Sequence, residues 1–189
     1  HMLKDKTYQE EMDYLVSNEK RNKYIRNLTS SLQGNTLCLF QYVEKHGKIL
    51  KELIENKAQD KKVFYVHGGV EADVREDIRA ITEKSDNAII IASYGVFSTG
   101  VNIRNLHNII FSSPSKSRIR NLQSIGRGLR LKDNNSSATL YDIADDISYK
   151  DKTNYTLQHF KERINIYNEE DFNYEIHNVE LTNGNKTGS

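Results

Sequence analysis

The stretch Thr36-Leu37-Cys38-Leu39-Phe40 decides the fold, because it is a continuous apolar run of strand length without alternation. Helices cover both faces of a parallel sheet, so its strands show this kind of uninterrupted apolar run. Four similar runs follow along the chain, over residues 63–66, 88–92, 108–111 and 138–143. We therefore predict a sheet of buried parallel strands.

Helix-length segments alternate with these runs, over residues 43–57, 71–84 and 117–129. Strands that alternate with helices are typical of an α/β domain with a parallel, doubly wound sheet and right-handed crossovers. Two polar-rich helices are predicted before the sheet, over residues 8–16 and 19–32, and one after it, over residues 155–167. Phe172, Tyr174 and Ile176 then alternate with polar residues, which predicts a further strand.

The chain of 189 residues suits one domain with appendages. We interpret residues 3–33 as lead-in helices, residues 34–147 as the sheet domain, and residues 148–189 as a helix-and-strand extension with a loose tail. The leading His1-Met2 pair is typical of a cloning remnant, so we expect the chain to begin within a longer protein.

Charge, cysteine content and the length of the apolar stretches limit the partners and the compartment that the chain can have. The net charge of +1 does not by itself indicate a nucleic-acid partner, but residues 116–130 carry five basic residues and no acid. The single cysteine, Cys38, cannot form an internal disulfide, which is consistent with a reducing compartment. No apolar stretch is long enough to cross a bilayer, so we expect no membrane partner.

Small, hydroxyl and amide residues gather where the predicted strands end. Gln41 follows the first strand, His67-Gly68-Gly69 follows the second, and Ser93 follows the third. Such residues let backbone amides approach an anion closely, and ligands bind at this edge of parallel sheets. Several of these loops on one edge suit the repeated phosphates of a nucleic-acid strand. Gly68-Gly69 also suits a simple turn, and His67 also suits a structural role.

Four stretches resemble, in order and spacing, the motifs of superfamily 2 helicases, and within that family the recombination helicases of T-even bacteriophages. Gln123-x-x-Gly126-Arg127-x-x-Arg130 resembles motif VI, and residues 91–93 with Ser98-Thr99-Gly100-Val101-Asn102 resemble motif V. Residues 36–42 resemble motif IV, and residues 66–69 followed by Arg75 resemble the stretch between motifs IV and V. The resemblance covers about residues 34–145 and implies a RecA-like fold, in the second helicase domain.

The resemblance implies residue roles on the ATP side. Arg127 and Arg130 match the arginines that reach the γ-phosphate, where a guanidinium neutralises charge during phosphoryl transfer. Gln123 matches the residue that connects motif VI to the acidic motif of the other domain. Gly100 and Asn102 match the motif that couples ATP to nucleic acid, although many relatives carry an aspartate where Asn102 stands.

The resemblance also implies a nucleic-acid surface. Gln41, Ser93 and Thr99 match positions that contact the backbone of the strand, with His67 and Gly69 beside them. The implied partner is single-stranded or branched DNA, bound without sequence specificity.

The sequence lacks the groups that would hold ATP. A P-loop needs Gly-x-x-x-x-Gly-Lys-Ser/Thr, but Gly47-Lys48 is followed by Ile49 and lies in a predicted helix. No Asp-Glu-x-His or Asp-Glu-Ala-Asp box is present, and one cysteine with scattered histidines gives no zinc ligand set. We therefore expect ATP and Mg²⁺ to be held mainly by an amino-terminal RecA-like domain, and these 189 residues alone to be inactive.

The resemblance thus implies the C-terminal motor half of an ATP-dependent DNA helicase. It would act on forks, Holliday junctions, D-loops and R-loops in repair and recombination, in the cytoplasm of a bacterial host cell. One alternative is a stand-alone nucleic-acid-binding module, which leaves the motif VI spacing without a reason. A Rossmann-type domain needs Gly-x-Gly-x-x-Gly where Gln41-Tyr42-Val43 stands, and a nuclease would have to rely on Asp142, Asp145 and Asp146.

Overall fold

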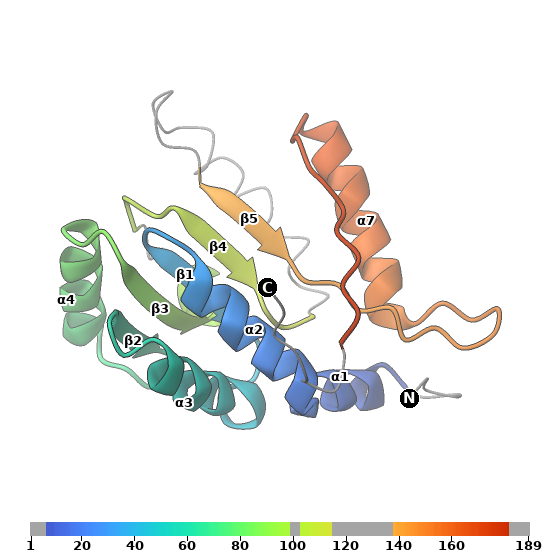
Figure 1. The fold of residues 1–189 in the computed structure, drawn as a ribbon, viewed down its shortest axis with the longest axis horizontal. Helices are drawn as coiled ribbons and strands as arrows, with labels where there is room; N and C mark the ends of the chain where they lie inside the picture. The colour runs from blue at the N-terminus through green and yellow to red at the C-terminus, as the bar shows by residue number, and fades with distance from the viewer. Residues whose placement is uncertain (1–6, 99–102, 115–137, 182–189) are drawn as a thin grey trace, which may run out of the picture.

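The computed structural model describes residues 7–98, 103–114 and 138–181, and within them five parallel strands form one sheet. The strand order is β2-β3-β1-β4-β5, and every neighbouring pair is parallel (Figure 1). The α/β fold with a parallel sheet is therefore confirmed. The strands are β1 (Thr36–Phe40), β2 (Lys62–Val66), β3 (Ala88–Ser93), β4 (Asn108–Phe111) and β5 (Thr139–Asp142).

Burial along the strands follows their positions in the sheet. Every residue of β1, β3 and β4 is buried, because these strands lie in the middle and are covered on both faces. The edge strands β2 and β5 are mostly half-buried and begin with an exposed residue. The apolar run of residues 36–40 therefore forms the centre of the sheet.

Helices lie against the sheet and beyond its β5 edge (Figure 1). The predicted helices over residues 8–16, 19–32, 71–84 and 155–167 are confirmed to within two residues at each end. The segment predicted as one helix over residues 43–57 begins as a π-helix, and the helix predicted over residues 117–129 lies outside the described residues. The observed helices are α1 (Tyr8–Ser17), α2 (Glu19–Ser31), the π-helix η1 (Val43–Gly47), α3 (Lys48–Lys57), α4 (Ala72–Glu83), α5 (Tyr94–Ser98) and α7 (Tyr155–Glu169).

Two hydrophobic cores sandwich the sheet, because successive residues of a strand point to opposite faces. Leu37 and Leu39 of β1 join the core on one face, whereas Cys38 and Phe40 join the core on the other. The first core is completed by α5 and α7, through Tyr94, Val96 and Tyr167. The second is completed by α2 and α3, through Ile25, Leu50 and Ile54.

Two buried ion pairs attach the terminal helices to the sheet. Arg21 of α2 binds both carboxylate oxygens of Asp145 at 2.8 and 3.0 Å. Arg163 of α7 binds both carboxylate oxygens of Asp142 at 2.6 and 2.8 Å, and the Tyr167 hydroxyl donates to the same carboxylate. Only 2% of the Arg21 side chain and 1% of the Arg163 side chain are exposed. The end of β5 and the segment just after it therefore anchor α2 and α7.

The strand predicted around Phe172, Tyr174 and Ile176 is wrong. This segment is extended but pairs with no strand in the described part of the chain, and it runs back alongside α7 (Figure 1). The rings of Phe172 and Tyr174 both lie 6.2 Å from the ring of Tyr167. The alternation therefore reflects packing against a helix, while Ile176 remains 58% exposed.

Replacing Arg163 with Met should strongly destabilise the domain. The change leaves the Asp142 carboxylate buried without its cation, and breaking a buried ion pair costs about 3–5 kcal/mol. Urea unfolding followed by circular dichroism measures this loss in the free energy of unfolding.

Lys48→Met is the matched control, because Lys48 pairs with Glu44 on the surface, with 58% and 73% of the two side chains exposed. Exposed pairs of this kind contribute about 0–1 kcal/mol. Equal, small losses in the two variants would show that the Arg163–Asp142 pair is hydrated in solution.

Candidate nucleic-acid interface

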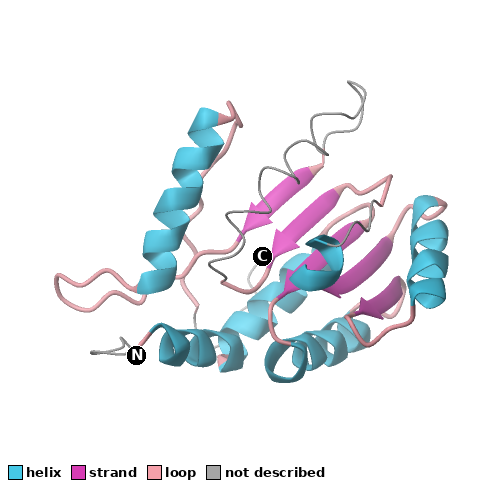
Figure 2. Ribbon diagram, turned by 180° about the vertical axis from the view of Figure 1, so that it is seen from behind, coloured by secondary structure: helices cyan, strands magenta, loops and turns pink. Residues whose placement is uncertain are grey.

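The loops after β1, β2, β3 and β4 meet at one edge of the sheet, which we call the carboxyl edge. Phe40 pairs with Ser93 and Val66 pairs with Ala92, while Phe111 ends β4 beside β1. The arrowheads of the strands point the same way in Figure 2. Residues that follow these strand ends are therefore brought together where α/β sheets bind ligands.

Gln41 lies at the centre of the carboxyl edge, directly after β1, and is exposed. Its backbone N–H donates a hydrogen bond to Ser113 Oγ at 3.0 Å, so the backbone is fixed while the side chain faces solvent. An exposed amide on a fixed backbone can donate to a phosphate oxygen without sequence preference.

Ser93 ends β3 next to Gln41 but is only 8% exposed. A contact between its side chain and a bound strand would involve this small exposed part. The chain continues from Ser93 into the short helix α5. Ser93 is thus the least accessible of the predicted contact residues that the structure describes.

His67 and Gly69 form a tight turn after β2. The Gly69 N–H donates to His67 Nδ1 at 3.0 Å, and the imidazole ring lies 5.2 Å from the ring of Tyr65. A Cβ atom on Gly69 would lie 2.8 Å from His67 Cε1, whereas one on Gly68 would meet nothing within 4 Å. Gly69 therefore allows the turn to close on His67, and the two residues form one unit at the carboxyl edge.

A buried chain of hydrogen bonds supports the carboxyl edge, and it could not be predicted from the sequence. His46 Nδ1 lies 2.6 Å from Ser113 Oγ, and His46 Nε2 lies 2.9 Å from Asn22 Oδ1. Asn22 Nδ2 donates to the carbonyl of Val16. His46 and Ser113 are 67 residues apart, so their contact could not be deduced from local pattern.

The hydrogen-bond partners fix the protonation of His46. Asn22 donates through Nδ2, so its Oδ1 accepts from His46 Nε2–H, and Nδ1 must accept from the Ser113 hydroxyl. Burial, together with the positive charge of Arg21, lowers the pKa of His46 to about 3. His46 is therefore a neutral structural histidine.

The π-helix η1 turns His46 inward. The N–H groups of His46 and Gly47 both donate to the carbonyl of Tyr42, which widens the turn by one residue. A Cβ atom on Gly47 would lie 2.5 Å from the ring of Phe40 and 2.8 Å from the Tyr65 hydroxyl. Only glycine permits this close approach of the turn to the end of β1.

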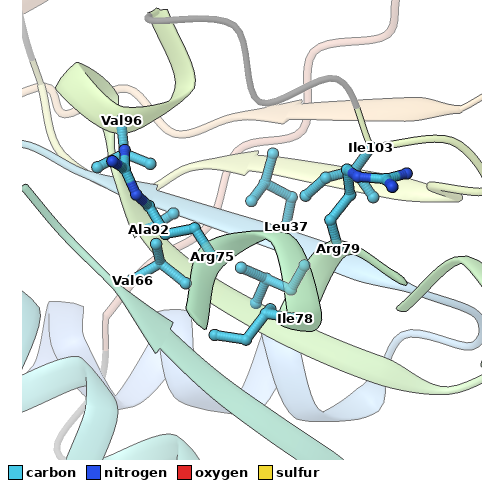
Figure 3. Close-up of a pocket in the computed structure, with 9 residues that line it drawn as sticks. Leu37, Val66, Arg75, Ile78, Arg79, Ala92, Val96 and Ile103 are labelled. Carbon is cyan, nitrogen blue, oxygen red and sulfur yellow. The ribbon is translucent and has the colours of Figure 1, made fainter. Parts of the chain in front are cut away.

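Arg75 of α4 is a further cation near the carboxyl edge. Its side chain extends toward Val96 along the rim of a small apolar cavity, whose lining includes Val66 and Ala92 (Figure 3). Its Nε is buried and has no hydrogen-bond partner in the described part of the chain. The sequence placed Arg75 in a helicase-like stretch without assigning it a role.

Six of the predicted site residues lie outside the described residues, so the structure does not address their geometry. Among the described residues, no group of three or more His, Cys, Asp or Glu side chains is arranged to hold a metal ion. None of the described helices is both long and apolar enough to cross a membrane. The six undescribed site residues are Thr99, Gly100, Asn102, Gln123, Arg127 and Arg130.

The neutral state of His46 predicts a loss of stability on acidification. The unfolded chain takes up a proton near pH 6.5, whereas the folded chain resists it down to about pH 3. The free energy of unfolding should therefore fall as the pH drops from 6.5 towards 3. His46 should account for a loss of about 2 kcal/mol between about pH 7 and about pH 5.

Urea unfolding at several pH values tests this contribution. His46→Gln should flatten the dependence of unfolding free energy on pH, although it lowers stability at pH 7. His177→Gln is the control, because His177 is 76% exposed and should leave the slope unchanged. A slope that persists in His46→Gln would mean that other groups cause it.

The sequence matches the helicase conserved C-terminal domain family over residues 19–132, more than half of the chain. The matched region begins in α2 and includes β1 to β4. It therefore contains the strand ends that form the carboxyl edge.

A relative from Enterobacteria phage T4, the ATP-dependent DNA helicase UvsW, is 39% identical over 192 residues. The alignment covers 95% of this chain and 38% of the relative. The crystal structure of T4 UvsW matches with a TM-score of 0.79 at 38% identity, over 95% of this chain and 38% of that chain. The chain thus spans 38% of the length of this relative.

More distant structures share the fold alone. The C-terminal domain of the DEAD-box protein Dbp5 matches with a TM-score of 0.59 at 10% identity, over 82% of each chain. The C-terminal part of the Fun30 ATPase domain matches with a TM-score of 0.53 at 15% identity, over 80% of this chain and 54% of that chain. The parallel five-stranded sheet is thus RecA-like. The family match over residues 19–132, together with this fold, shows that the chain belongs to the helicase conserved C-terminal domain family.

Proposed function

We propose that this domain is the C-terminal motor half of an ATP-dependent DNA helicase. The observation that carries the proposal is the convergence of Gln41, His67 and Ser93 on adjacent strand ends of a domain related to UvsW. These residues suit contacts to a DNA backbone, and Thr99 is proposed to add to them. Arg75, half-buried beside the same edge, offers a further positive charge.

On the ATP side, we assign Arg127 and Arg130 to the γ-phosphate and Gln123 to the contact with the other motor domain. Gly100 and Asn102 are assigned to the coupling between ATP binding and DNA binding. ATP bound with Mg²⁺ supplies the phosphoryl group whose hydrolysis drives the motor. The P-loop is absent from this sequence, so we place ATP and Mg²⁺ mainly on an amino-terminal RecA-like domain of the same protein.

The proposed motor works by closure of the two domains. This domain closes over the nucleotide and delivers its arginines, and it opens after hydrolysis. Because the carboxyl edge holds the DNA backbone, each closure shifts that hold along the strand. A ligand drives such a change only when it binds the two states differently, and ATP bridging both domains meets this condition.

The proposed substrates are branched DNAs, namely forks, Holliday junctions, D-loops and R-loops, in repair and recombination in the cytoplasm of a bacterial host cell. The relationship to UvsW supports this assignment. A stand-alone nucleic-acid-binding module is the alternative that the first experiment below distinguishes.

In the full-length protein, Arg130→Ala should lower DNA-stimulated ATP turnover by about 10³-fold or more, the scale of arginine fingers elsewhere. DNA affinity should be unchanged, because Arg130 is proposed to contact ATP and not the DNA. Turnover and fluorescence anisotropy of labelled DNA, measured on the same preparation, test both expectations.

Arg104→Ala provides the matched control, since Arg104 is exposed in the loop before β4, away from the carboxyl edge. Its turnover should equal that of the wild type. Unchanged turnover in Arg130→Ala would remove the arginine from the mechanism, and the binding-module alternative would then explain the domain better.

Backbone recognition also predicts steep salt dependence with little sequence preference. Affinity for a single-stranded oligonucleotide should fall about tenfold or more between about 50 and about 200 mM salt, because phosphate contacts release counterions. Two oligonucleotides of unrelated sequence should bind with similar affinities. A strong preference for one of them would point to base contacts instead.

A further inference from the structure

Ser113 connects three strand ends at the carboxyl edge. Its hydroxyl oxygen accepts from the Gln41 N–H, directly after β1, and its carbonyl accepts from the Tyr94 hydroxyl, directly after β3. Ser113 itself lies two residues after the end of β4. One residue thereby sets the spacing of the loops that follow β1, β3 and β4.

The orientation of the Ser113 hydroxyl is fixed by buried groups. It donates to His46 Nδ1, while His46 Nε2–H is held by Asn22. Ser113 and His46 are 0% exposed, and Asn22 is 2% exposed. In such surroundings a satisfied hydrogen-bond chain is rigid, because any rotation would leave a buried polar group without a partner.

Ser113 holds the backbone of the exposed residue Gln41. Gln41 carries its side chain into solvent, while its backbone is fixed by the bond to Ser113. Loss of the Ser113 hydroxyl would free the Gln41 N–H and allow this backbone to move. Pre-organised donors bind better than mobile ones, because less conformational freedom is lost on binding.

We propose that Ser113, oriented by His46 and Asn22, is a positioning residue that holds Gln41 in place for contact with the DNA backbone. This inference rests on the proposed function. Ser113 does not itself touch the DNA, and its effect is transmitted through Gln41.

Ser112 offers a matched control for a purely structural role. It is also 0% exposed, lies in the same loop, and donates its hydroxyl hydrogen to the carbonyl of Leu39. Among the contacts of the described residues, this hydroxyl bonds neither to Gln41 nor to His46. Ser112→Ala and Ser113→Ala should therefore lose similar stability but differ in their effect on DNA binding.

The test uses the full-length protein and a mixed-sequence single-stranded oligonucleotide. Ser113→Ala should raise the DNA concentration for half-maximal ATP turnover about fivefold, the scale of one hydrogen bond, while turnover at saturating DNA stays within about twofold. Ser112→Ala should leave both values unchanged. Thermal unfolding of the two variants gives their stabilities under the same conditions.

A double-mutant cycle with Gln41→Ala shows whether Ser113 acts through Gln41. In the Gln41→Ala background, Ser113→Ala should not change the DNA concentration for half-maximal ATP turnover any further, because the side chain to be positioned is gone. Additive effects, or equal effects of Ser112→Ala and Ser113→Ala, would overturn the inference.

Failure of the proposed function gives a different result. In that case Arg130→Ala retains full turnover, or DNA does not stimulate turnover at all in the wild type. If Arg130→Ala is inactive and Gln41→Ala weakens DNA binding while Ser113→Ala does not, only the positioning inference fails.

Discussion

The parallel hydrogen-bond ladders on the two sides of β1 are the constraint on which the rest of the structure depends. They align the end of β1 with the ends of β3 and β4, and β3 in turn aligns β2. In a parallel pair the two neighbouring strands end at the same edge of the sheet, whereas in an antiparallel pair they end at opposite edges. The proposed DNA contacts, the turn at His67 and the Ser113 hydrogen bonds all follow from this alignment.

Much of the fold could be predicted from the sequence, because burial on both faces leaves a local record. The uninterrupted apolar runs of residues 36–40 and 88–92 indicate central parallel strands, and the polar residues after them mark the carboxyl edge. Gln41 and Ser93 could be chosen as site candidates for the same reason. Their neighbourhood follows from strand direction alone, without knowledge of the side-chain contacts.

The rest of the fold and of the candidate site depends on contacts between residues far apart in the sequence and could not be predicted. His46 lies in a polar segment that looks like a surface helix, yet it is buried because η1 turns it towards Ser113. Arg163 likewise looks like a surface cation and is buried by its pair with Asp142. The alternation of Phe172 and Tyr174 was misleading, because a helix and a strand can both provide an apolar surface for an extended segment.

The central position of β1 also determines when the domain can fold. Thr36 pairs with Ile89, which follows it by 53 positions in the chain, and with Asn108 on the other side. The most buried strand is therefore synthesised first and has no strand partner until β3 emerges. Such long-range pairing slows folding and leaves an apolar strand with two open edges in the nascent chain. Among the described elements of this domain, α2 and α3 can shield it during synthesis, since they pack on the same core and emerge before β3.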